Sequence, residues 1–493
     1  MIGSTANEQR SPLDQLNNDV LLYIFHLHHL DIRDEYDRND STLTNSPNWG
    51  RERWWYKLAH VSKRWRNSIL ESPSTLGLHL VCTYGTPVID MLENSPPLPL
   101  IITYLIQNRE TTTEDEEGIL HALKPEYRDR VRRIGHCMPA SNLQNVVEAM
   151  DEPFPNLEYM LIKSMTKGDA GLMLPKKFQA PQLNRLKLWG TVPPIGSLLL
   201  PTTSTMALVT LTLSDIPPSA FGPSYLHARL SQMPQLESLI VTFCSPLPNH
   251  EVRRQLSDAP IRMHAILPNL RFFGFRGVSA YLDGLVARIT APLLSTFHIH
   301  FFNQLTFSIP HLSQFLNATE TIRIRSIRLV FFAGSGSAIL VNDPSRRDQI
   351  HPLTIALLCG QGDWQMASAA RILNELQTVF SASEELALIR EEDDLSPEDR
   401  GEVDPMLWRD LLTPFSNVTT LHVQDNLIGK LSRSLQFEDG ELPQDLLPSL
   451  KELGYSGGLD ARDFLTPFIN ERQVAGRPVS LKMVDFTNYR WKL

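Results

Sequence analysis

Cysteine is scarce in this sequence, with four residues among 493. They are widely separated and form no C-x-x-C pair; they stand at Cys82, Cys137, Cys244 and Cys359. This spacing argues against a disulfide framework or a zinc site and is typical of reduced thiols. We therefore expect a cytoplasmic or nuclear protein.

Long uncharged apolar runs are also missing. The first ten residues are polar, which excludes a secretory signal at this position. The longest candidate for a membrane span, residues 322–341, contains three arginines, so we expect no membrane association. Positive charge is not in excess either, since the net charge is -9, and this argues against nucleic-acid binding.

The sequence lacks the common signatures of catalysis and cofactor binding. It contains no G-x-x-x-x-G-K-[ST], H-E-x-x-H or G-x-S-x-G motif. Histidines gather at 26, 28 and 29, where a helix C-terminus explains them better than a metal does. His298 and His300 alternate with apolar residues, as a solvent-facing pair on a strand would. We predict no enzymatic activity, no cofactor and no metal site.

The first eighty residues contain two amphipathic segments. In the segment from Pro12 to Leu27, apolar residues recur at spacings of three and four, which predicts a helix, and Asn17 is placed to cap its start. A polar loop follows from 31 to 53. A second helical pattern then places apolar residues on one face, at Trp54, Leu58, Val61, Trp65 and Ile69. Pro73 ends this helix, and alternating leucines after it have the period of a strand.

These residues resemble the F-box family. The pattern of that family is matched in order at Leu16, Asp19, Val20, Leu21, Ile24, Phe25, Leu58, Ala59, Val61, Lys63, Trp65, Arg66, Ser72, Pro73 and Leu76. The chain departs from it at Asn17, where proline is usual, at Ser62, where cysteine is usual, and in the longer loop. The resemblance covers about 70 residues, and its specificity comes from the ordered combination.

The resemblance implies that these helices bind a Skp-type linker protein, which joins them to a cullin scaffold of an SCF-type ubiquitin ligase. By family position, the residues that contact the linker are Leu13, Leu16, Leu21, Ile24, Phe25 and Trp65. Each of these residues could instead belong to an internal core. A module of this size buries little surface alone, so we expect a partner to cover part of its apolar face.

One irregular repeat, L-x-x-L-x-L, dominates the remaining sequence. It recurs at steps near 25 to 30 residues, and proline often precedes its first position by two residues, as in FPNLEYMLI and MPQLESLIV. Copies begin at Leu157, Leu183, Leu208, Leu236, Leu270, Leu294, Ile324, Val418 and Leu450, with a weaker one at Val131. The pattern resembles leucine-rich repeats, in which strand–helix units stack because no single unit buries its own apolar face. Helices are predicted between the strands at 224–233, 280–289 and 309–316.

The segment 342–413 interrupts this rhythm. It contains a predicted helix at 366–380 and an acidic stretch at 391–404, so we interpret it as an insertion with a mobile loop.

The predicted organisation is therefore a disordered N-terminus at 1–10, an all-α F-box domain at 11–80 and a leucine-rich-repeat-like β/α solenoid at 81–493. The fold class is α/β or α+β. The predicted function is that of a substrate-recognition adaptor that holds an unidentified target protein near a ubiquitin-conjugating enzyme. Two alternatives stay open: a binding scaffold without ubiquitin transfer, and an enzyme with an unrecognised site.

Overall fold

The structure is a computed structural model. It describes residues 16–27, 53–105, 111–165, 175, 178–190, 206–216, 222–244, 264–302, 304, 306–332, 336–342, 351–358, 362–391, 404–435, 446–456 and 459–484. The chain divides into two compact units, Met1–Ala207 and Leu208–Leu493, called unit 1 and unit 2 below. The fold is mixed α/β, and most of its strands pair in parallel, which confirms the α/β fold class.

Unit 1 begins with helices and continues into strands joined by helices. Its elements are a helix at 18–27, α2 (Trp54–Ala59), α3 (Lys63–Glu71), β1 (Leu80–Cys82), α4 (Val88–Asn94), β2 (Leu100–Tyr104), α5 (Thr113–Ala122), α6 (Pro125–Arg128), β3 (Val131–Met138), α7 (Ala140–Glu148), β4 (Tyr159–Ser164) and β5 (Arg185–Trp189). The strands pair in parallel in the order β1-β2-β3-β4-β5.

Unit 2 has a similar strand–helix alternation. Its elements are β6 (Thr210–Ile216), α9 (Pro223–Leu230), β7 (Ser238–Phe243), β8 (Ala265–Ile266), β9 (Phe272–Gly277), α11 (Ser279–Val286), β10 (Ile289–Thr290), β11 (Thr296–Phe301), α12 (Pro310–Asn317), β12 (Ser326–Phe332), β13 (Gly336–Asn342), β14 (Leu353–Leu358), α13 (Gly362–Glu375), α14 (Gln377–Phe380), β15 (Glu385–Glu391), α15 (Pro405–Leu412), β16 (Thr420–Val423), α16 (Asp425–Leu435), β17 (Glu452–Tyr455), α17 (Leu459–Val474) and β18 (Ser480–Met483). The order in its main sheet is β6-β7-β9-β11-β14-β13-β12-β15-β16-β17-β18.

The repeated apolar residues form continuous ladders across neighbouring strands. Leu239 of β7 pairs with Phe273 of β9, which pairs with Phe297 of β11. Farther along, Leu386 pairs with Leu421, which pairs with Leu453. All of these side chains are buried. Each repeat therefore covers the apolar residues of the next one, as its short strand alone could not.

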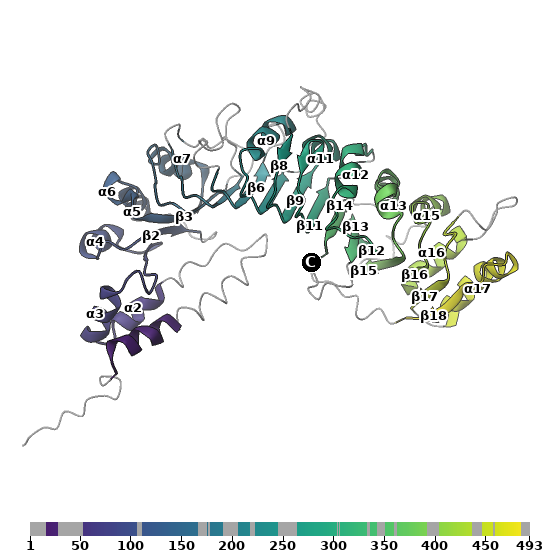
Figure 1. The fold of residues 1–493 in the computed structure, drawn as a ribbon, viewed down its shortest axis with the longest axis horizontal. Coiled ribbons are helices and arrows are strands. Elements are labelled where there is room, and N and C mark those ends of the chain that lie inside the picture. The colour runs from purple at the N-terminus through teal and green to yellow at the C-terminus, as the bar shows by residue number, and fades with distance from the viewer. Residues whose placement is uncertain are drawn as a thin grey trace, which may run out of the picture. The chain divides into compact units, whose positions relative to one another are not determined.

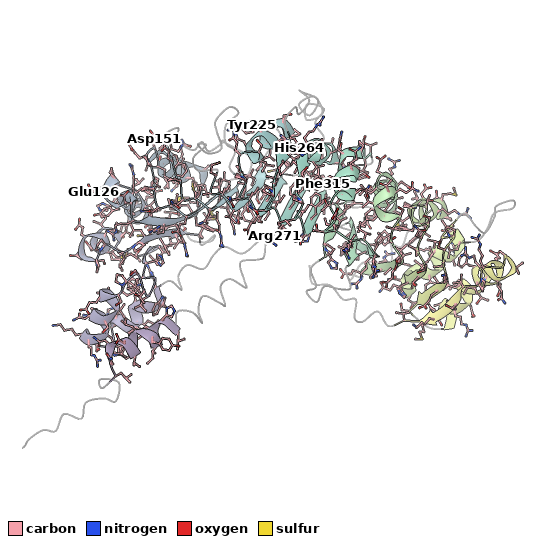
Figure 2. The ribbon with its side chains drawn as sticks, in the orientation of Figure 1. Glu126, Asp151, Tyr225, His264, Arg271 and Phe315 are labelled. Atoms are coloured by element: carbon pink, nitrogen blue, oxygen red, sulfur yellow. The ribbon has the colours of Figure 1, made fainter. Side chains whose placement is uncertain are left out.

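The helices of unit 2 cover one face of its sheet (Figure 1). The ring of Phe297 meets Phe315 of α12 at 5.9 Å, and Phe331 of β12 meets Trp408 of α15 at the same distance. Phe315 of α12 is labelled in Figure 2. Among the described residues no helix covers the opposite face, which carries the residues that alternate with the ladder. We call this face of unit 2 the helix-free face.

The predicted helices between strands are present, with shifted ends. Those expected at 224–233, 280–289 and 309–316 correspond to α9, α11 and α12. The helix expected at 366–380 begins earlier, and Leu376 separates it into α13 and α14.

The segment 342–413 differs from the expected insertion in its described parts. It supplies β14, which lies between β11 and β13, and β15, which lies between β12 and β16. Strand β13 runs antiparallel to both of its neighbours, so the hairpin of β12 and β13 breaks the simple parallel order. The repeat at β15 is hard to recognise because Ser383 replaces the first leucine. Ser383 is nevertheless buried, and its hydroxyl donates to the Phe380 carbonyl at 2.7 Å.

A substitution in the ladder tests how much one buried leucine contributes to the stability of the neighbouring strands. We expect Leu421→Ala to destabilise the region of β15–β17 by about 2–5 kcal/mol, because it opens a cavity between two buried leucines. Hydrogen exchange of the backbone amides in β15, β16 and β17 measures this local effect. The control is Thr420→Ala, next along the same strand and only half-buried, which should leave exchange nearly unchanged. Equal effects of the two substitutions would refute the stabilising role of the ladder.

Candidate functional site: the apolar stripe of the N-terminal module

The helices that precede β1 form a small module, residues 16–27 and 53–79, here called the N-terminal module. Its first helix starts as the sequence predicts, because the Asn17 Oδ1 accepts a hydrogen bond from the backbone N–H of Asp19 at 3.3 Å. Arg64 of α3 holds the same end. Its guanidinium donates to the Leu16 carbonyl and, at 3.0 Å, to the Asn18 side chain.

The internal core of this module is built from a few large side chains. Leu21 and Phe25 are each 1% exposed. The Phe25 ring meets the half-buried Trp65 ring edge-on, with 5.1 Å between centroids. Trp54 and Trp55 of α2 are also buried, so the tryptophans serve as core residues.

Ser62 explains one departure from the F-box pattern. Its hydroxyl accepts a hydrogen bond from the backbone N–H of Trp65 at 3.1 Å and so caps the start of α3. A cysteine would be a weaker acceptor here, so serine is a favourable replacement.

Polar contacts attach the module to the first strand and helix that follow it. Arg53 donates to the Val81 carbonyl of β1 at 2.9 Å, and within the module Trp55 Nε1 donates to the His79 carbonyl, the last residue before β1, at 3.1 Å. The hydroxyl of Tyr56 lies 3.7 Å from the sulfur of Met91 in α4. Burial raises the pKa of Tyr56, so this phenol stays protonated and can donate. Within unit 1, the module is thus fixed to the start of the strand region.

One face of helix 18–27 carries apolar side chains that the chain leaves in water. These residues lie one turn apart, so they form one stripe along the helix. They are Val20, Tyr23, Ile24 and Leu27, with exposures of 45%, 63%, 43% and 44%. We call them the apolar stripe. Val61, in the turn between α2 and α3, is also 58% exposed. Exposed apolar side chains gathered in this way mark an interaction surface.

The six residues predicted to contact a partner are therefore divided by the structure. Leu21 and Phe25 face inward, Trp65 packs against Phe25, and Leu16 is half-buried. Leu13 lies outside the described residues, and of the other five only Ile24 is strongly exposed. Val20, Tyr23 and Leu27 were not among the predicted contacts. Their spacing from Ile24 was the signal that could have identified them.

No constellation for catalysis or metal binding appears in the described part of the chain. No group of three or more His, Cys, Asp or Glu residues there could hold a metal ion. Burial raises the pKa of Cys82 to about 12 and also raises the pKa of Cys137, so neither thiol is an activated nucleophile. None of the described helices has the length and apolar character needed to cross a bilayer.

Comparison with known proteins adds no relative. No protein-family model matches this chain, and no curated protein matches it.

One buried histidine gives unit 1 a pH dependence. His136 of β3 is fully buried, stacks on Tyr104 at 6.0 Å, and has no hydrogen-bond partner at either ring nitrogen. Burial lowers its pKa to about 3, against 6.5 for an ordinary histidine. The fold thus favours the neutral ring. This stability is fully present above pH 6.5 and is lost as the pH falls towards 3.

We therefore expect His136 to lower the free energy of unfolding by about 3 kcal/mol between pH 7 and pH 4. His136→Phe keeps an aromatic ring and removes this contribution, so its unfolding free energy should fall less steeply over the same range. Urea denaturation of both proteins at pH 7, 5 and 4 measures the difference, from which other titrating groups cancel. Parallel pH dependence in the two proteins would show that His136 does not have the lowered pKa.

Proposed function

We propose that this protein is a non-catalytic adaptor of an SCF-type ubiquitin ligase, in which the N-terminal module binds a Skp-family linker protein. The observation that carries the proposal is the apolar stripe. It lies on the first helix of a segment whose ordered residues resemble the F-box family, and the chain itself leaves it exposed.

The size of the module supports a partner-bound role. Its internal core uses Leu21 and Phe25, while Ile24 on the same helix stays in water. The apolar residues of this helix are thus divided between the internal core and an exposed surface. A helix that presents apolar residues at i, i+3, i+4 and i+7 fits a hydrophobic groove of a partner.

The strand region supports the second half of the proposal, a repeat solenoid that holds a target protein. In-register ladders, parallel strands and helices on one side are the features that stacked strand–helix repeats produce. Outside the buried cluster of Val330, Leu340 and Ile389, the helix-free face then offers side chains from adjacent strands to one partner. A surface of this kind recognises its target residue by residue.

The proposed mechanism is proximity. The adaptor binds the linker at one site and the target at another, so a target lysine reaches the conjugating enzyme at a high effective concentration. No residue of this chain takes part in bond making. The compartment, cytoplasm or nucleus, is part of the same proposal.

Linker binding is tested with one charge placed in the stripe. We expect Ile24→Asp to weaken capture of a purified Skp-family linker at least tenfold, because the carboxylate would be desolvated in an apolar contact. The matched control is Leu120→Asp in α5, which is 39% exposed in the same unit but outside the module. Titration calorimetry with the full chain gives both affinities. Unchanged linker affinity of Ile24→Asp, or equal losses in both variants, would contradict the proposed surface.

Affinity purification separates this function from the alternatives. Recovery of both linker and cullin with the wild-type chain, and loss of both from Ile24→Asp, supports the ligase adaptor. Recovery of the linker without cullin supports the scaffold that does not promote ubiquitination. A wild-type chain that recovers neither protein argues against the adaptor altogether.

A further inference from the structure

The central strands of unit 2 have a charge distribution unlike that of the whole chain. The protein carries 55 acidic residues, yet six adjacent strands, β7, β9, β11, β14, β13 and β12, contain no aspartate or glutamate. Their helix-free face carries basic side chains. These are Arg276, His298, His300 and Arg328, and His351 lies two residues before β14.

Three of these basic groups lie on neighbouring strands. Arg276 of β9 and His300 of β11 are direct partners in the parallel register, and His298 lies two residues before His300 on the same face. Neighbouring strands are about 5 Å apart, so these side chains stand next to one another. We call Arg276, His298 and His300 the basic cluster.

The basic cluster has no acidic residue on its own strands, β9 and β11, or on β7 and β14, which pair directly with them. The Nε of Arg276 is buried without a hydrogen-bond partner, while its guanidinium lies 5.8 Å from the centre of the Phe302 ring. A buried donor without an acceptor is costly and points to a missing ligand. The nearest acidic residue in the strand order is Asp215 of β6, whose backbone N–H donates to the Thr242 hydroxyl at 3.0 Å; Thr242 of β7 is in turn the register partner of Arg276. On the other side, Glu385 of β15 lies beyond three intervening strands from β11 and pairs with His422 at 3.4 Å.

Basic groups placed side by side disfavour the charged form of one another. Burial, His298 and Arg276 together lower the pKa of His300 to about 4, so its ring is neutral at pH 7. A neutral imidazole still offers an N–H to an acceptor, and Arg276 supplies a full charge. An oxyanion at this position would satisfy the guanidinium and relieve the crowding of donors.

We propose that the basic cluster binds a carboxylate-rich segment of a partner protein. Apolar side chains border the cluster, because Gly274 lies between Ile240 and His298 in the register and the Phe272 ring, 5.3 Å from the His298 ring, occupies the space above it. A carboxylate of the peptide accepts from Arg276 and from His300. The identity of this partner as the ubiquitination target rests on the proposed function, whereas the binding site itself does not.

The test measures binding of acetyl-hexaglutamate-amide to the full chain by titration calorimetry, with acetyl-hexaglutamine-amide as the neutral probe. We expect Arg276→Gln to weaken hexaglutamate binding about tenfold or more, the loss for one charge-assisted hydrogen bond. Arg271→Gln is the matched control, because Arg271 is exposed just before the same strand (Figure 2) and changes the net charge equally. His300→Leu is a second variant, with an expected loss of about threefold or more, for use if Arg276→Gln does not fold.

Selective loss in the cluster variants, with Arg271→Gln like wild type, supports the site. Equal losses in the control and the cluster variants, or equal binding of the two peptides, would overturn it. Inorganic phosphate is titrated into the same proteins as a further probe. Arg276-dependent binding of phosphate without binding of hexaglutamate would replace the carboxylate segment by a phosphorylated one and reject the assignment made here. The Ile24→Asp chain should bind hexaglutamate normally, so failure of this site is distinct from failure of linker binding.

Discussion

The structure depends on one constraint: an apolar pair on a short strand is buried only when the next repeat lies against it. Leu239, Phe273 and Phe297 form successive rungs of one ladder, and the described helices of unit 2 close it from one side. The two faces of the sheet therefore differ in what packs against them. The helix side buries the ladder, and the helix-free face has its own buried apolar cluster around Val330, Leu340 and Ile389, so only the rest of that face is available for binding.

The sequence predicted the positions of most of these strands, because the leucine spacing and the alternation of a strand indicate the same buried residues. It failed where the pattern was disguised. Ser383 occupies a leucine position, so β15 was assigned to an insertion although Leu386 and Leu388 follow it. Strand β13 has no counterpart in a simple repeat, and its antiparallel pairing depends on contacts distant in sequence.

The N-terminal module shows a different limit of sequence reasoning. Periodicity identified the helix and its Asn17 cap, yet it could not divide a wide apolar face between core and surface. By family position, Leu21 and Phe25 were predicted to contact the linker protein, whereas the structure shows both side chains buried within the module. Ile24 and its neighbours one turn away remain outside. The division depends on where Trp65 lies in space, which spacing along the chain does not reveal.

The central claim is that helix 18–27 is covered by a ligase linker. Hydrogen–deuterium exchange of the full chain, with and without a purified Skp-family linker, tests it most directly. The account predicts slower exchange in helix 18–27 and in the turn at Val61 when the linker is added, with β6–β18 unchanged. No protection in helix 18–27, or protection confined to unit 2, would contradict it.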